Sequence, residues 1–100
     1  MKPVIISDAA IEDLDHIWDF LAGADPAIAT RTCSELIEAA IDLAEFPERG
    51  QVVGQIRAHG IRRRVLRQWL ILYRVTPRSV EVVRIVNGRS DLSQQLSSLS

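Results

Sequence analysis

Nine arginines carry the permanent positive charge in the second half of the chain, and their side chains are well suited to binding an anion. Residues 51–100 hold these nine arginines against two acids, a formal charge of +7, whereas residues 1–50 hold eleven carboxylates against three bases, a formal charge of −8. Each guanidinium presents a planar fork of five donors that pairs with a carboxylate or a phosphate at two points. The split charge therefore predicts a cationic surface that binds an acidic protein segment or a phosphate.

Cleavage of RNA by its own 2′-hydroxyl is a reaction that such a surface would assist. The reaction needs a base for the hydroxyl, an acid for the leaving oxygen and cations for the phosphate, and arginine supplies only the cations. The groups in this half that could move protons are Tyr73, His59 and Glu81. Glu81 alternates along its strand away from the face of Arg84, so no acid–base pair is preassembled. Binding is therefore favoured over catalysis, with RNA cleavage as the alternative.

The arginines and the tyrosine also have a structural interpretation. Arg62-Arg63-Arg64 lie on one predicted strand and point to alternate faces, so all three cannot contact one ligand. Arg84 lies in an apolar strand and could instead pair with a helix carboxylate such as Asp15 or Asp19. Tyr73 suits core packing with its hydroxyl in a hydrogen bond. Arg89 follows a glycine, and we expect it to be exposed.

Metal and cofactor chemistry is not expected. The two histidines and the single cysteine lie far apart, without the spacing of metal ligands, and the chain contains no glycine-rich phosphate loop. His16 lies among acids and is predicted to be solvated. Cys33 falls on the apolar stripe of a helix as inert core, and Trp18 and Trp69 are predicted to be packing residues.

Size and bulk composition restrict the location and the partners. One cysteine cannot form an internal disulfide, which fits a reducing cytoplasm. No apolar run approaches about 18 residues, so we expect no membrane span. The net charge is −1, and an acidic helix pair would repel a long duplex, so stable direct DNA binding is not expected.

The first half of the chain predicts two helices after a short strand at 3–6. Ser7 is a suitable N-cap for the first helix, and Gly23 is its stop. Asp25-Pro26 starts a second helix, which ends by Pro47. Apolar residues recur at helical spacing in both: Ile11, Leu14, Ile17, Trp18 and Leu21, then Ile28, Cys33, Leu36, Ile37, Ala40, Leu43 and Ala44. Their short connection predicts an antiparallel hairpin.

The second half changes from helical to strand-like periodicity. The pattern predicts strands at 61–66, 69–75 and 80–87, joined by turns at Arg67-Gln68 and Thr76–Ser79 and ended by Gly88. The order strand, helix, helix, strand, strand, strand indicates an α+β fold with two layers. We expect the hairpin to cover one face of a mostly antiparallel sheet and to leave the other face free for the arginines.

Four motifs, in order along residues 4–92, resemble the RelE/ParE superfamily of toxins. The first is the helical stretch from Ala10 to Phe20, and the second is Phe46-Pro47-Glu48-Arg49-Gly50, which resembles a Pro-x-x-Gly helix end. Gly60-Ile61-Arg62 with Leu70-Ile71-Leu72-Tyr73-Arg74-Val75 resembles the family's strands, and Val83 to Leu92 resembles its closing Arg-x-x-His-Gly-Arg-x-Asp. Asn87 stands where many members have histidine, which counts against nuclease activity.

The resemblance implies the toxin of a bacterial type II toxin–antitoxin pair. The ParE branch, which the Ile17-Trp18 pattern favours, is associated with inhibition of DNA gyrase, and the RelE branch with cleavage of mRNA on the ribosome. A small antitoxin, usually acidic where it binds, neutralises either type. We therefore expect a cytoplasmic toxin domain at 1–92, followed by a Ser/Gln-rich tail at 93–100, that forms a hetero-oligomer with its antitoxin and acts on gyrase.

Two alternatives stay open at this point, a ribosome-dependent mRNA interferase and a non-toxic interaction module. The residues expected to contact the target or the antitoxin come from the strands and the end of the last strand: Arg62, Arg63, Arg64, Tyr73, Arg84, Asn87 and Arg89. For a nuclease, the catalytic candidates among them would be Arg62, Tyr73, Arg84 and Arg89.

Overall fold

The computed structural model describes residues 2–48, 50–52 and 60–89. The predicted tail at 93–100 therefore lies outside the described residues, as do His59 and Arg57. The elements follow the chain in the order β1 (Val4–Ile6), α1 (Asp8–Ala22), α2 (Pro26–Asp42), β2 (Gln51–Val52), β3 (Arg62–Leu66), β4 (Trp69–Val75) and β5 (Val80–Asn87). The α+β class is confirmed, and the two-residue strand β2 is an addition to the predicted order.

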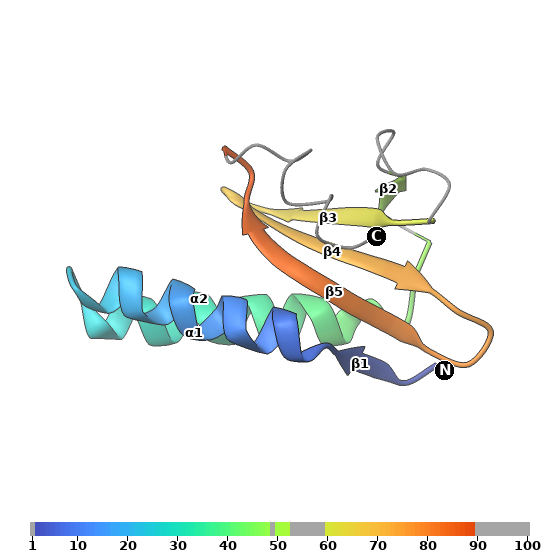
Figure 1. Ribbon diagram of the computed structural model, residues 1–100, viewed down its shortest axis with the longest axis horizontal. Helices are drawn as coiled ribbons and strands as arrows, with labels where there is room; N and C mark the ends of the chain where they lie inside the picture. The colour runs from blue at the N-terminus through green and yellow to red at the C-terminus, as the bar shows by residue number, and fades with distance from the viewer. Residues whose placement is uncertain (1, 49, 53–59, 90–100) are drawn as a thin grey trace.

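The strands form one mixed sheet in the spatial order β1-β5-β4-β3-β2. β1 pairs with β5 in parallel, and every other pairing is antiparallel. The turn at Arg67-Gln68 is confirmed, with Arg67 in the left-handed region at φ 54°. The pairing of β4 with β5 shifts by one residue: Leu72 lies opposite Arg84, but the next residue, Tyr73, lies opposite Val82. This shift marks a bulge in β5. Figure 1 shows the long β5 strand crossing the hairpin beside β4.

Local capping fixes where both helices begin. The Ser7 hydroxyl accepts a hydrogen bond from the Ala10 amide at 3.1 Å, and the Asp25 carboxylate accepts one from the Ala27 amide at 2.9 Å. The second helix ends at Asp42. Beyond it the amides at positions 43, 44 and 45 bond to carbonyls three residues back, so the chain continues as tighter turns toward Pro47.

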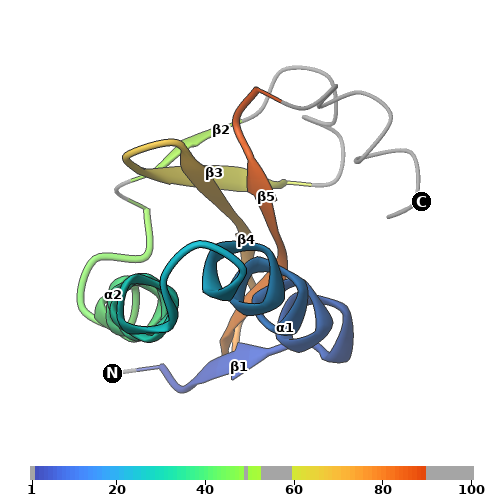
Figure 2. The ribbon, with the colours of Figure 1, turned by 90° about the vertical axis from the view of Figure 1, so that its left-hand side faces the viewer.

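The main core joins the helix hairpin to one face of the sheet, and Figure 2 shows the two helices lying together on one side of the strands. The helices contribute residues such as Leu14, Ile17 and Leu36 to it, and β4 and β5 contribute Ile71 and Val82. Trp69 also belongs to this core and is 6% exposed, which confirms its predicted packing role. Neither helix in the described part of the chain is long and apolar enough to cross a bilayer.

The expectation that the second sheet face is free is wrong over its central part. Ile61, Leu70, Leu72 and Val86 form a second buried cluster, with Val83 packed against it. The signal was present in the sequence, because β4 is apolar at five consecutive positions from Trp69 to Tyr73. A strand that is apolar at every position is buried on both faces.

Candidate protein-binding surfaces

Tyr73 and Arg62 converge on the backbone of Gly50 and fix the chain that follows α2. The Tyr73 side chain is fully buried, and its hydroxyl accepts a hydrogen bond from the Gly50 amide at 2.9 Å. The Arg62 Nη1 donates to the Gly50 carbonyl at 2.8 Å and to the Glu48 carbonyl at 3.2 Å. These two predicted binding residues therefore hold their own domain together, because their polar groups satisfy a returning loop.

Arg64 and Arg63 lie on opposite faces of β3, as strand alternation predicts. Arg64 lies opposite Ile71 of the main core, and its Nη1 donates to the Ala39 carbonyl of α2 at 2.9 Å. Arg63 lies opposite Leu72 of the second cluster and is half-buried. Arg64 thus joins the sheet to the second helix, and Arg63 belongs to the face away from it.

Arg84 is paired with a carboxylate of α1, although the partner is Asp13 and not Asp15 or Asp19. Its Nε and Nη2 donate to the two oxygens of Asp13 at 2.7 and 2.8 Å. The exposed fractions of the side chains are 21% and 11%. These hydrogen bonds raise the pKa of Arg84, and the charge of Glu12 adds to the increase while burial opposes it. The guanidinium is therefore a fixed, partly desolvated cation.

The same contacts explain how α1 covers the edge of β5. β1 pairs only with residues 80–82 of β5. Past that point, the Ser7 hydroxyl donates to the Val83 carbonyl at 3.0 Å, and Asp13 accepts from the Ile85 amide at 2.9 Å. Side chains of the capping residue and of the helix therefore take over the hydrogen bonds that an edge strand would make.

Two further arginines form ion pairs within the domain. Arg67 pairs with Glu35 of α2, and Arg74 pairs with Glu81 across the β4–β5 ladder at 2.7 Å. Within residues 60–89, Arg62 and Arg64 are thus engaged by backbone carbonyls, and Arg67, Arg74 and Arg84 by carboxylates. Among the arginines at 60–89, those at 67, 74, 78 and 89 are exposed, and Arg67 and Arg74 of these form the ion pairs just described. The predicted arginine-covered sheet is therefore much reduced.

Asn87 and Arg89 lie where β5 ends, beside a small pocket. The side-chain oxygen Oδ1 of Asn87 accepts a hydrogen bond from the Arg89 backbone amide at 2.9 Å, which forms an Asx turn. The pocket has a volume of about 250 Å³, and its walls are His16, Ile17 and Phe20 of α1 with Trp69 and Asn87 of the sheet. We call Phe20, Asn87 and Arg89 the β5-end surface. Phe20 is 75% exposed and was not singled out from the sequence.

An apolar groove lies between the two helices, where the sequence predicted packed core. We call it the hairpin groove. It has a volume of about 360 Å³, and its apolar walls are Ile6, Ile11, Leu14, Trp18, Cys33 and Ile37, with Asp15 at its rim. Burial and the nearby Asp15 charge raise the pKa of the Cys33 thiol.

Trp18 differs from its predicted packing role, whereas Cys33 packs against the main core as predicted but is less buried than a core residue. Trp18 is 39% exposed, and its indole N–H donates to the Thr30 hydroxyl at 3.2 Å. Cys33 is only half-buried and donates to the Leu14 carbonyl at 3.6 Å. The helical periodicity correctly placed both residues on the apolar sides of their helices. The apolar surface of the helix pair is, however, wider than the area that the sheet covers.

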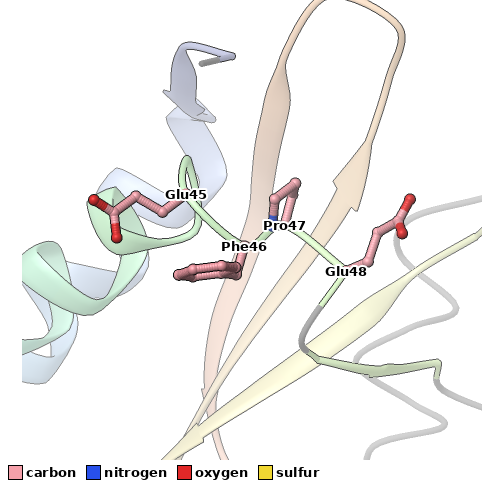
Figure 3. Close-up of a pocket in the computed structure, with 4 residues that line it drawn as sticks. All are labelled: Glu45, Phe46, Pro47 and Glu48. Carbon is pink, nitrogen blue, oxygen red and sulfur yellow. The ribbon is translucent and has the colours of Figure 1, made fainter.

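A third hollow, of about 450 Å³, lies over the loop from Glu45 to Glu48. Phe46 is 57% exposed there. Figure 3 shows the carboxylates of Glu45 and Glu48 pointing away from each other, on opposite sides of Phe46 and Pro47. The two acids therefore do not converge on a common ligand. Within the described residues no group of three or more potential metal ligands is found.

Comparisons with known proteins agree with this architecture. A chain in a solved structure titled "Chromosomal ParDE TA system from P. aeruginosa" has the same fold, with a TM-score of 0.74, 21% sequence identity, and coverage of 87% of this chain and 96% of that chain. No curated protein matches the sequence. The family model described as "ParE toxin of type II toxin-antitoxin system, parDE" matches residues 4–92. The chain therefore belongs to the ParE toxin family of type II toxin–antitoxin systems.

Proposed function

We propose that this ParE-family toxin acts by binding a protein target, that the target is DNA gyrase, and that a cognate antitoxin neutralises it in the cytoplasm. The observation that carries the proposal is the family match over residues 4–92. Gyrase is the target associated with the ParE branch. An acidic antitoxin segment and the toxin would form a hetero-oligomer.

The positions of Tyr73 and Arg84 support binding over RNA cleavage. Tyr73 is fully buried, and its hydroxyl already accepts the Gly50 amide. Arg84 is held by both oxygens of Asp13. A nuclease needs such groups at a surface where the 2′-hydroxyl and phosphate of a bound RNA can reach them. Both candidates instead serve the internal structure.

The β5-end surface is the proposed target contact. It combines a largely exposed aromatic ring, Phe20, with an exposed arginine, Arg89, and the pocket beside Asn87. Aromatic residues and arginine are the side chains that most often dominate the free energy of protein–protein binding. For the antitoxin, Arg89 is the proposed partner of an acidic segment, because it is an exposed arginine at the end of β5.

Gyrase supercoiling with matched alanine variants tests the target and the surface together. We expect the purified toxin to inhibit supercoiling, and Phe20→Ala or Arg89→Ala to weaken inhibition about tenfold or more. Arg78→Ala is the control, because Arg78 is an exposed arginine in the turn before β5, at the opposite end of that strand. Equal loss in all three variants would contradict the proposed surface, and unaffected supercoiling with wild-type toxin would contradict gyrase as the target.

One observation favours the mRNA-interferase alternative. His16 of α1 lines the same pocket as Asn87, so a helix could supply the imidazole that position 87 lacks. Primer extension on mRNA from a translating extract distinguishes the two functions. Codon-linked cuts that disappear in His16→Ala, with supercoiling unaffected, would establish the alternative.

A non-toxic interaction module is the remaining possibility. Induced expression in a bacterium that lacks the antitoxin tests it directly. Arrested growth with wild-type toxin, relieved by Arg89→Ala, is the expected result. Normal growth at a protein level confirmed by immunoblot would mean that the chain has lost toxicity.

A further inference from the structure

The β5-end surface is built from two elements that are far apart in the chain. Phe20 lies near the C-terminal end of α1, whereas Asn87 and Arg89 lie at the end of β5 and just beyond it. Figure 1 shows β5 rising away from α1 toward this end of the strand. The relative positions of these three side chains therefore depend on how α1 is held against β5.

The first attachment of α1 to β5 lies at the start of the helix. β1 pairs with β5 as far as Val82, and the Ser7 amide donates to the Val82 carbonyl at 3.0 Å. The Ser7 hydroxyl donates to the next carbonyl, that of Val83, at 3.0 Å. These bonds set where the helix begins, but bonds at one end of a helix leave its tilt and rotation to contacts further along.

Asp13 supplies a second attachment further along α1. Its Oδ2 accepts from the Arg84 Nε at 2.7 Å and from the Ile85 amide at 2.9 Å, and its Oδ1 accepts from the Arg84 Nη2 at 2.8 Å. The bond to the Ile85 amide is the more restrictive, because a backbone amide has no rotamer to change and belongs to the strand itself. The carboxylate, which is 11% exposed, therefore fixes one side of α1 against a defined position of β5.

The pocket beside Asn87 lies directly beyond this attachment. Three α1 residues of its wall follow Asp13 by three, four and seven positions, so they lie on the same side of the helix. They are His16, Ile17 and Phe20. Asn87 follows Ile85 by two positions, so both side chains lie on one face of β5. Seven helical residues span about 10 Å and two strand residues about 7 Å, so the attachment and the pocket are neighbours along both elements.

We infer that Asp13 is a positioning residue for the target contact. It is not itself part of the β5-end surface. It acts by fixing the tilt and rotation of α1 on β5, which set how Phe20 lies relative to Asn87 and Arg89. A binding constellation works well only when its members are held to within about 0.5 Å of the productive geometry. The inference rests on the proposed function, because it takes the β5-end surface as the contact with the target.

A double-mutant cycle with Phe20→Ala tests whether Asp13 acts through Phe20. Asp13→Asn keeps the size of the side chain but turns an amide N–H2 group toward one of the donors, so part of the attachment is lost. We expect it to raise the concentration needed for half-maximal inhibition of gyrase supercoiling about fivefold. In the Phe20→Ala background the same change should have less than about a twofold effect, because the ring that it displaces is already absent. Effects that simply multiply would overturn the inference.

Gly50→Ala is the matched control for a general loss of stability. An added Cβ there would clash with the Tyr73 hydroxyl, which destabilises the domain without altering α1 or the end of β5. All variants are compared at a temperature at which circular dichroism shows that they are folded. We expect Gly50→Ala to inhibit supercoiling like wild type, whereas Asp13→Asn does not. If inhibition instead falls with the melting temperature in both variants alike, Asp13 has only a structural role and the inference is wrong.

Trp69 reports the position of α1 without gyrase. It lines the pocket and is 6% exposed, and Trp18→Phe leaves it as the only one of the chain's two indoles. In this background Asp13→Asn should shift Trp69 emission to the red and increase its quenching by acrylamide, because a displaced α1 uncovers the ring. Gly50→Ala should change neither.

Unchanged Trp69 emission and quenching in folded Asp13→Asn would also overturn the inference. Wild-type toxin that does not inhibit supercoiling would instead contradict the proposed function, and the Trp69 signal would still decide whether Asp13 positions α1.

Discussion

A charged residue in an apolar strand is stable only when its charge has a partner, and Arg84 shows how that partner is supplied. Both oxygens of Asp13 accept hydrogen bonds from the guanidinium, and one of them also accepts the Ile85 amide. The two side chains are mostly buried. Removal of either side chain leaves the other charge poorly solvated. A single substitution should therefore cost more unfolding free energy than the intact ion pair contributes on balance.

We predict that Arg84→Met lowers the free energy of unfolding by about 2 kcal/mol, because Asp13 loses a charge-assisted partner. The double variant Asp13→Asn/Arg84→Met should lose less than the two single variants added together. Urea denaturation of Arg84→Met, Asp13→Asn and the double variant, each compared with wild type, measures the three changes in unfolding free energy. A fully stable Arg84→Met variant that has lost toxicity would instead support the contact role expected from the sequence.

Cys33 gives a prediction on pH. Burial, with the Asp15 charge, raises the pKa of its thiol, so the folded protein holds the thiol proton more tightly than the unfolded chain does. The resulting stabilisation is complete below the unfolded thiol's pKa and is lost as the pH rises through the folded value. Iodoacetamide should therefore react more slowly with folded than with denatured protein, with the pH profile displaced upward. Asp15→Asn should lower the pKa of the folded thiol part of the way toward that of the unfolded chain. Coincident pH profiles for folded and denatured protein would contradict the prediction.

The partners of the arginines could not be predicted from the sequence, for a physical reason. Arg62 and Arg64 bind backbone carbonyls, those of Gly50 and Ala39, and every residue has such a carbonyl. Arg84 was expected to have a helix carboxylate as a possible partner. The choice of Asp13 depends on how α1 is rotated against β5, and successive helix positions differ by about 100°.

At the scale of elements, local signals were sufficient for most boundaries. Ser7 and Asp25 cap their helices as predicted, and the strands from β3 to β5 follow the alternation and turn residues. β2 was missed because it has only two residues and is defined by pairing with β3. The hairpin groove was missed because periodicity shows that a stripe is apolar but not how much of its width a neighbour covers.

The chain segment after α2 depends on a glycine for a steric reason. A Cβ at Gly50 would clash with the Tyr73 hydroxyl and the Arg63 carbonyl. The hydroxyl belongs to a fully buried side chain and the carbonyl to a strand, so neither can move easily. The Gly-ended motif noted in the sequence thus has a packing explanation, which is the close approach of the loop to β3 and β4.

We predict that Gly50→Ala costs about 2 kcal/mol of unfolding free energy, because it overpacks this contact. For a domain of this size the melting temperature should fall by roughly 10 °C. Gly23→Ala is the matched control. Its φ is −60° and the nearest atom to an added Cβ is 3.5 Å away, so stability should be unchanged or slightly higher. Equal melting temperatures for Gly50→Ala and wild type would contradict the clash.

For the whole molecule, the structure changes the meaning of the charge split. The sequence places opposite charges on opposite halves of the chain, and much of the positive charge is used to join the sheet to the helices and the loop. The acids of the hairpin are engaged much less by the described residues. Over the residues that the structure describes, the exposed charge is therefore mainly acidic on the helix pair, with exposed basic side chains at Arg78 and Arg89.

Binding of the antitoxin should be visible in the stability of the whole domain. A ligand that binds only the folded state adds about 4 kcal/mol when its free concentration is a thousand times Kd. The melting temperature should then rise by more than about 10 °C with the cognate antitoxin. Arg89→Ala should reduce this rise, and Arg78→Ala should preserve it. Coincident melting curves with and without the antitoxin would contradict the proposed interface, because no tight ligand of the folded state can leave its stability unchanged.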